Sequence, residues 1–195
     1  MIRRAFKRAA LALGWLLALP HRVRYAVARR AVGDEIAFRA ASERLALRPG
    51  QLGVYVRQAF YRASLQHCGR DVYFGFMTVL SKPDARIGDN VYLGRFCCVG
   101  LCDIGGHTKI ADGVQLLSGR HHHAAHDDEA EDAVIYRRMK LGRHAWIGAN
   151  AVIMADVGDQ AVVGAGAVVV KPVPDADRVV GVPAESMRRV RSLAA

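Results

Sequence analysis

A six-residue repeat runs through the second half of this chain and constrains its fold more than any other feature. Between residues 141 and 174 an aliphatic residue opens each unit, at Leu141, Ile147, Ile153, Val157, Val163 and Val169. A small residue usually follows it, and the same spacing extends upstream to Ile87. A short fixed period of this kind predicts stacked coils, because each coil can bury its apolar face only against its neighbours.

The repeat also divides the chain. We expect residues 69–174 to form a parallel β-helix, interrupted by an excursion over residues 122–140, where the hexapeptide phase is lost. Long excursions from a regular scaffold usually carry function. Residues 1–68 predict a basic α-helical extension, with helices over residues 1–20, 21–47 (broken near Gly33) and 51–66. Residues 175–195 predict a tail that ends in a short helix.

Basic charge is concentrated at the N-terminal end. The formal net charge is +10, and the first 48 residues hold 11 Lys and Arg against 3 acidic residues. Because the rest of the chain is nearly balanced, nucleic-acid binding is not expected. The uncharged run over residues 9–20 is too short to span a bilayer. It fits either an interfacial helix on anionic lipid or a helix packed on the body or on a partner subunit.

These features favour a cytoplasmic protein, located on the inner face of the membrane if residues 1–20 bind lipid. The four cysteines have neither zinc-site nor disulfide-framework spacing, which is typical of a reducing compartment.

Several longer motifs resemble one family. They are WIGANAV from Trp146, VGAGAVVVKPVP from Val163, VVGVPA from Val179, and a histidine that ends a hexapeptide at His121. Through them, residues 87–191 resemble the hexapeptide-repeat acyltransferases, especially the galactoside and maltose O-acetyltransferases. The resemblance implies a left-handed parallel β-helix and a homotrimer with active sites between subunits. It also implies acetyl-CoA as acyl donor, a saccharide as acceptor and no required metal. The basic N-terminal end adds the hypothesis that the chain works at the cytoplasmic membrane face, in cell-surface polysaccharide biosynthesis.

The resemblance places the catalytic base at His121, the sixth residue of the unit LLSGRH. A sugar hydroxyl is a poor nucleophile while protonated, and an imidazole can remove its proton as the oxygen attacks a thioester. His123 is the main rival, because related branches place the base slightly further along.

By the same resemblance, the acyl donor contacts Trp146, Ala149, Ala165, Val170, Lys171 and Arg188. The backbone N–H of Ala149 would stabilise the negative charge that forms on the carbonyl oxygen. Two positions depart from the family pattern. Glu185 stands where an arginine is common, and Gly94 stands in place of an asparagine that contacts the cofactor.

Two other functions stay open. The first is a γ-type carbonic anhydrase, which shares the β-helix and binds zinc through three histidines; His107, His121, His123, His126 and His144 supply imidazoles. The second is a non-catalytic trimeric scaffold, which the departures at Glu185 and Gly94 favour.

Overall fold

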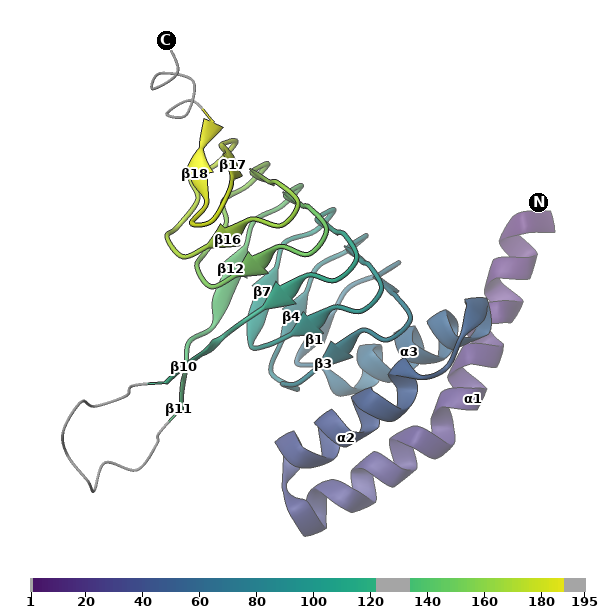
Figure 1. Ribbon diagram of the computed structural model, residues 1–195. Helices are drawn as coiled ribbons and strands as arrows, with labels where there is room; N and C mark the ends of the chain where they lie inside the picture. The colour runs from purple at the N-terminus through teal and green to yellow at the C-terminus, as the bar shows by residue number, and fades with distance from the viewer. Residues whose placement is uncertain (1, 122–133, 188–195) are drawn as a thin grey trace, which may run out of the picture.

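The computed structural model describes residues 2–121 and 134–187, and it has two parts (Figure 1). Three helices form the N-terminal part: α1 (Ile2–Val32), α2 (Asp34–Ala46) and α3 (Gly50–Ser64). Short strands then wind into stacked coils that extend away from the helices, and the last described strands, labelled β17 and β18, lie at the far tip of the stack. The predicted C-terminal helix lies outside the described residues.

The coils form three sheets, one on each side of a triangular prism, and the strands pair in parallel except for the last strand of the second sheet, which is antiparallel to its neighbour. Sheet 1 has four strands, β1 (His67–Cys68), β4 (Arg86–Ile87), β7 (Cys102–Ile104) and β12 (Met139–Leu141). Sheet 2 has seven, β2 (Tyr73–Phe74), β5 (Tyr92–Leu93), β8 (Lys109–Ile110), β13 (Trp146–Ile147), β15 (Val162–Val163), β17 (Arg178–Val180) and β18 (Glu185–Ser186). Sheet 3 has five, β3 (Val79–Leu80), β6 (Cys98–Val99), β9 (Gln115–Leu116), β14 (Val152–Ile153) and β16 (Val168–Val169).

The hexapeptide rhythm explains the interior of the prism. In each two-residue strand one side chain points inward and the other outward, so the aliphatic residue that opens a hexapeptide is buried. Ile110, Ile147 and Val163 stack in register on sheet 2 and are fully buried. The neighbouring glycine must be small, because a Cβ on Gly148 would lie 2.4 Å from the backbone nitrogen of Ala165 in the next coil. The predicted β-helix with a helical extension is confirmed.

The helical part closes the open end of the first coil. The Oγ atom of Ser42 in α2 lies 2.6 Å from the hydroxyl of Tyr61 in α3 and accepts a hydrogen bond from the backbone N–H of Leu80. Arg57 is fully buried and donates to the carbonyl oxygens of Leu45, Arg48 and Phe74. These bonds satisfy backbone groups that the terminal coil would otherwise leave unpaired.

The structure differs from the expected helices at Pro20. A break there was predicted, but α1 is a single helix that passes through Pro20. Proline cannot donate to the carbonyl of Leu16 one turn earlier. Both residues are exposed, so water can hydrogen-bond that carbonyl instead. The predicted break at Gly33 is confirmed, because Gly33 separates α1 from α2 with a φ of 85°.

The boundaries around the coils also shift slightly. The first strand, β1, begins at His67, before the expected start of the β-helix at residue 69. At the other end of the excursion, Met139 and Lys140 already belong to β12, which pairs with β7. The coil therefore resumes two residues earlier than expected, because Met139 and Leu141 both turn inward and are buried.

Candidate functional site

Trp146 stands on the outer face of sheet 2. It is 53% exposed, and its strand β13 lies between β8 and β15. Together with Val162, Arg178 and Met187 it lines a hollow of about 440 Å³ near the C-terminal end of the sheet. The indole therefore presents a broad apolar surface to whatever covers this face.

Ala149 and Ala165 lie one above the other at the corner between sheets 2 and 3. The backbone N–H of Gly166 donates to the carbonyl of Ala149 at 2.8 Å, which fixes the two coils in register. Among the described residues, neither the N–H of Ala149 nor that of Ala165 has a hydrogen-bond acceptor. This corner therefore offers two free backbone donors from consecutive coils.

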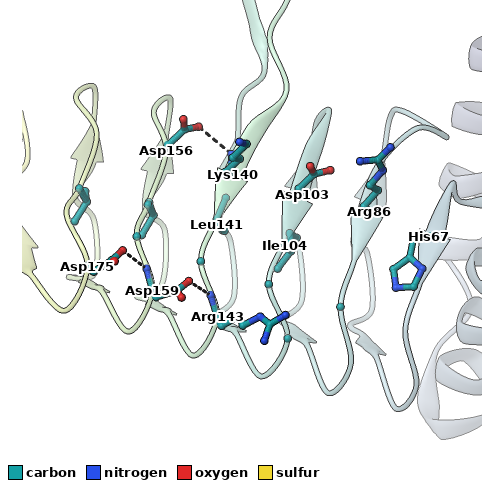
Figure 2. Close-up of a pocket in the computed structure, with 17 residues that line it drawn as sticks. His67, Arg86, Asp103, Ile104, Lys140, Leu141, Arg143, Asp156, Asp159 and Asp175 are labelled. Carbon is teal, nitrogen blue, oxygen red and sulfur yellow. Dashed lines mark hydrogen bonds between the residues drawn. The ribbon is translucent and has the colours of Figure 1, made fainter.

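The N–H of Ala149 is free because this corner lacks an aspartate acceptor that other corners have. Elsewhere an aspartate at the third place of a hexapeptide accepts the N–H of the third residue in the preceding coil. Asp112 accepts from Arg95 at 2.8 Å and Asp159 accepts from Arg143 at 2.7 Å. Figure 2 shows the second of these bonds, together with that from Asp159 to Asp175. The N–H of Ala149 lacks such an acceptor because the equivalent unit of the next coil, which opens at Val163, has Ala165 at its third place.

The aspartate caps predict an acid-dependent stability. The N–H of Arg95 and the Arg95 guanidinium hold the pKa of Asp112 below its ordinary value of 3.8. A lowered carboxylate pKa stabilises the fold above the unfolded value, and this stabilisation is lost as pH falls through the folded value. Asp112→Asn should therefore unfold at lower urea concentration than the native chain at pH 6. The difference between the two midpoints should shrink below about pH 4; a constant difference from pH 6 to pH 3 would contradict the argument.

Val170 and Lys171 occupy the corner between sheets 3 and 1, at the C-terminal end of the stack. They line a hollow of about 250 Å³ with Pro183, Asp177 and Glu185. Lys171 is exposed and no ion pair is recorded for it among the described residues. Glu185 lies in β18 at the rim of the same hollow, so an acid does stand beside the expected phosphate position.

The departure at Gly94 has a steric cause. A Cβ at this position would lie 2.5 Å from the Oδ1 atom of Asp112 and 2.6 Å from the backbone of Ala111. An asparagine side chain would therefore collide with the next coil. Gly94 is required by the stack, and its presence says nothing against a functional site.

His121 ends β10 (Gly119–His121), which pairs antiparallel with β11 (Val134–Tyr136). This hairpin starts and returns at the corner between sheets 3 and 1, and it projects from the prism in Figure 1. His123, His126 and Arg188 lie outside the described residues.

Two arginines that the sequence analysis missed anchor the returning chain. Arg138 donates to the Oδ1 atom of Asp103 and to the carbonyl of Asp84, and Arg137 pairs with Asp156 at 3.1 Å. Asp156 also accepts the N–H of Lys140 at 2.9 Å. The returning end of the hairpin is thus fixed against neighbouring coils on both sides of β12.

The described residues of one chain do not bring the predicted site together. Val170 and Lys171 share one hollow, Trp146 lines another, and Ala149 and Ala165 lie at a different corner. His121 leaves the prism at the corner that also holds Val170 and Lys171. Sheet 3 separates the two corners, so the described residues of one chain do not form one compact site.

A hollow of about 610 Å³ lies on sheet 1 and its corner with sheet 2. Figure 2 shows its lining side chains, which alternate in charge along the stack, among them Arg86, Asp103, Lys140 and Asp156. It holds none of the predicted site residues. Asp159 and Asp175 line this hollow at the third place of their hexapeptides. Asp89 and Asp112 hold the same place elsewhere in the stack, a signal that the sequence analysis missed.

Of the five histidines named for the zinc alternative, the structure describes the side chains of His107 and His144. In the described part of the chain, no group of three or more His, Cys, Asp or Glu side chains could hold a metal ion. The rings of His107 and His144 stack at a centroid distance of 4.8 Å and are nearly parallel. They lie at equivalent corners of two consecutive coils, where stacking is a sufficient account of both.

The chain is similar to named acetyltransferases. It is 30% identical to galactoside O-acetyltransferase from Escherichia coli over 129 residues, which cover 64% of this chain and 54% of the relative. It is 36% identical to Nodulation protein L from Rhizobium leguminosarum over 111 residues, 54% of this chain and 48% of the relative. The chain thus spans about half the length of the curated relatives it matches. No protein-family model matches it.

Solved structures share the fold. A maltose O-acetyltransferase from Clostridium difficile superposes with a TM-score of 0.66 at 21% identity, covering 78% of this chain and 86% of the other. A hexapeptide-repeat acetyltransferase from Vibrio cholerae superposes with a TM-score of 0.60 at 25% identity, covering 81% of this chain and 93% of the other. A Bacillus cereus N-acyltransferase, solved with dTDP-4-amino-4,6-dideoxyglucose and coenzyme A, gives 0.53 at 16% identity, covering 71% and 93%. The resemblance to hexapeptide-repeat acyltransferases and the fold class it implied are confirmed.

Proposed function

We propose that this chain, which is similar in sequence and fold to the hexapeptide-repeat acyltransferases, transfers an acyl group from coenzyme A to a saccharide hydroxyl. The observation that carries the proposal is the free backbone N–H of Ala149 at an exposed corner of the stack. A fixed N–H donor suits a carbonyl oxygen that becomes negatively charged during acyl transfer. The motifs from Trp146 and Val163, on which the resemblance rests, pass through this corner in consecutive coils.

The acyl donor is proposed to be acetyl-CoA. Its pantetheine chain carries amide groups, and the free N–H of Ala165, one coil beyond Ala149, can donate to one of them. Val170 supplies apolar contact, and the exposed Lys171 supplies a cation for the phosphates. Arg188 is assigned the same role by resemblance alone. The Bacillus cereus structure with coenzyme A supports a donor of this class for the fold.

His121 is the proposed general base. Its imidazole removes the proton of the acceptor hydroxyl while the oxygen attacks the thioester carbon. The new C–O bond forms as the carbonyl oxygen gains negative charge, which the Ala149 N–H stabilises. The C–S bond then breaks, and the imidazolium returns the proton to the departing thiolate. No acyl-enzyme is needed, because both substrates are held together and positioning supplies much of the rate.

A homotrimer would assemble this site. His121 and the Ala149 corner lie on opposite sides of sheet 3 in one chain, so two neighbouring copies can face each other with one element each. The names of the relatives, galactoside and maltose O-acetyltransferase, support a saccharide acceptor. We place the reaction in the cytoplasm, in the synthesis of a cell-surface polysaccharide.

Titration calorimetry with acetyl-CoA tests the proposal. We expect saturable binding, sedimentation of the chain as a trimer, and release of free thiol when a saccharide with unblocked hydroxyls is added. A chain that binds no acetyl-CoA would instead be a scaffold. A chain that binds stoichiometric zinc and no acetyl-CoA would favour the carbonic anhydrase alternative.

A further inference from the structure

One face of α1 is apolar and uncovered. Among the side chains the structure describes, it is formed by Leu13, Leu16, Leu19, Val23 and Val27, and we call it the α1 stripe. Leu16 and Val27 are 66% and 65% exposed, and Val23 is 55% exposed. Their spacing of three or four residues places all of them on one side of the helix.

The opposite face of α1 is where the helix contacts the rest of the protein. Ala18 and Tyr25 are buried there, and a Cβ on Gly14 would lie 2.8 Å from Tyr55 of α3. The rings of Tyr25, Phe38 and Phe60 form one aromatic cluster between the three helices. Because α1 is already secured by this face, the α1 stripe is not needed for packing within the chain.

The charges beside the α1 stripe are all positive. Residues 2–32 contain no acidic residue. Arg24 and Arg30 are exposed, and Arg22 lies with its guanidinium 5.1 Å from the centre of the Trp15 ring. Four more basic residues precede the α1 stripe, Arg3, Arg4, Lys7 and Arg8. An exposed Trp with a neighbouring Arg is typical of the boundary between lipid headgroups and acyl chains.

We propose that the α1 stripe is a docking surface for an anionic lipid membrane, on which α1 lies parallel to the surface. The apolar side chains enter the acyl boundary, and the arginines contact lipid phosphates. Complementary charge selects this occupant, because a second copy of the same helix would bring like charges together. No helix in the described part of the chain is long and apolar enough to cross a bilayer, so the contact is peripheral.

Sedimentation of the full chain with vesicles tests this proposal. We expect binding to vesicles of phosphatidylcholine with phosphatidylglycerol, and about tenfold weaker binding to phosphatidylcholine alone. Binding should also weaken in high salt, because salt screens the arginines. Leu16→Ser with Val23→Ser and Val27→Ser should weaken binding to the anionic vesicles by about tenfold or more. Arg24→Gln with Arg30→Gln should weaken it by a smaller factor.

Leu47→Ser with Leu52→Ser is the matched control, because both leucines are exposed in the helical part but outside α1. This variant should bind vesicles like the native chain. Failure of the native chain to bind anionic vesicles, or a serine triple variant that binds equally well, would overturn the proposal. If the native chain does not bind vesicles and the serine triple variant dissociates into smaller species, the α1 stripe contacts another copy of the chain. Acetyl-CoA binding, measured in parallel, is independent of every one of these outcomes.

Discussion

His121→Ala is expected to lower kcat for acyl transfer by about 10²–10⁴-fold, the range typical of a lost general base. The KM for acetyl-CoA should change little, because the imidazole acts on the acceptor hydroxyl, whereas donor binding is assigned to Ala165, Val170 and Lys171. The rate of thiol release at saturating substrate measures kcat. The pH profile adds an independent test: the ascending limb near neutral pH should disappear in the variant, because an imidazole titrates in that range.

Two neighbouring histidines serve as comparisons. His123→Ala should retain most of the activity if His121 is the base. His126→Ala should retain it in either case, because residue 126 is outside the hexapeptide phase. A large loss in His123→Ala with an active His121→Ala would move the base by two residues. Full activity in both variants would contradict general-base catalysis from this segment.

The coils were predictable because the repeat reports burial directly. The residues that open each hexapeptide, such as Ile147, Ile153 and Val163, are fully buried in the positions that their spacing indicated. The excursion was also predictable, because the phase is lost between two regular units. The residue at which the regular coils resume after the excursion was less predictable. Met139 and Leu141 are inward-facing in β12, but they follow a charged segment that hides their alternation.

The helices show where local rules were insufficient. The prediction of a break at Pro20 assumed a carbonyl that needs a protein donor, and this fails on the exposed side of α1. The tertiary contact of Gly14 with Tyr55, which secures α1 on α3, leaves no clear trace in the sequence. Arg57 is similar, because only the structure shows that its acceptors are the carbonyls of Leu45 and Arg48, at the end of α2, and of Phe74 in the first coil.

The candidate site was predictable as a set of positions but not as an assembly. Ala149 was proposed as a backbone donor, yet the reason that its N–H is free lies in Ala165, one coil away. The signal was present at the third place of the hexapeptides, which is Asp89, Asp112, Asp159 or Asp175 in four units and carries no carboxylate at Ala149 and Ala165. The residue at this third place shows where an aspartate binds the backbone N–H of the preceding coil and where that N–H has no acceptor.

The third place of the hexapeptides also gives the second large prediction. Ala165→Asp places a carboxylate at the third position of its unit, where Asp112 accepts the N–H of Arg95 and Asp159 that of Arg143. The new carboxylate should accept the N–H of Ala149 in the same way. The donor is then occupied, and a negative charge stands where the oxyanion must form. We expect kcat to fall by about 10²–10³-fold, the usual cost of one lost oxyanion donor.

The same substitution should not harm the fold, because it adds a hydrogen bond of a kind that other corners already contain. The free energy of unfolding, measured in urea, should stay constant or rise by about 1 kcal/mol. Gly106→Asp is the matched control: a Cβ there lies 3.2 Å from the carbonyl oxygen of Asp89 and 3.6 Å from its nitrogen, at the corner between sheets 1 and 2. It should leave acyl transfer unchanged. An Ala165→Asp variant with native stability and native turnover would show that the Ala149 N–H does not contact the reacting carbonyl, and the proposed chemistry would lose the observation on which it rests.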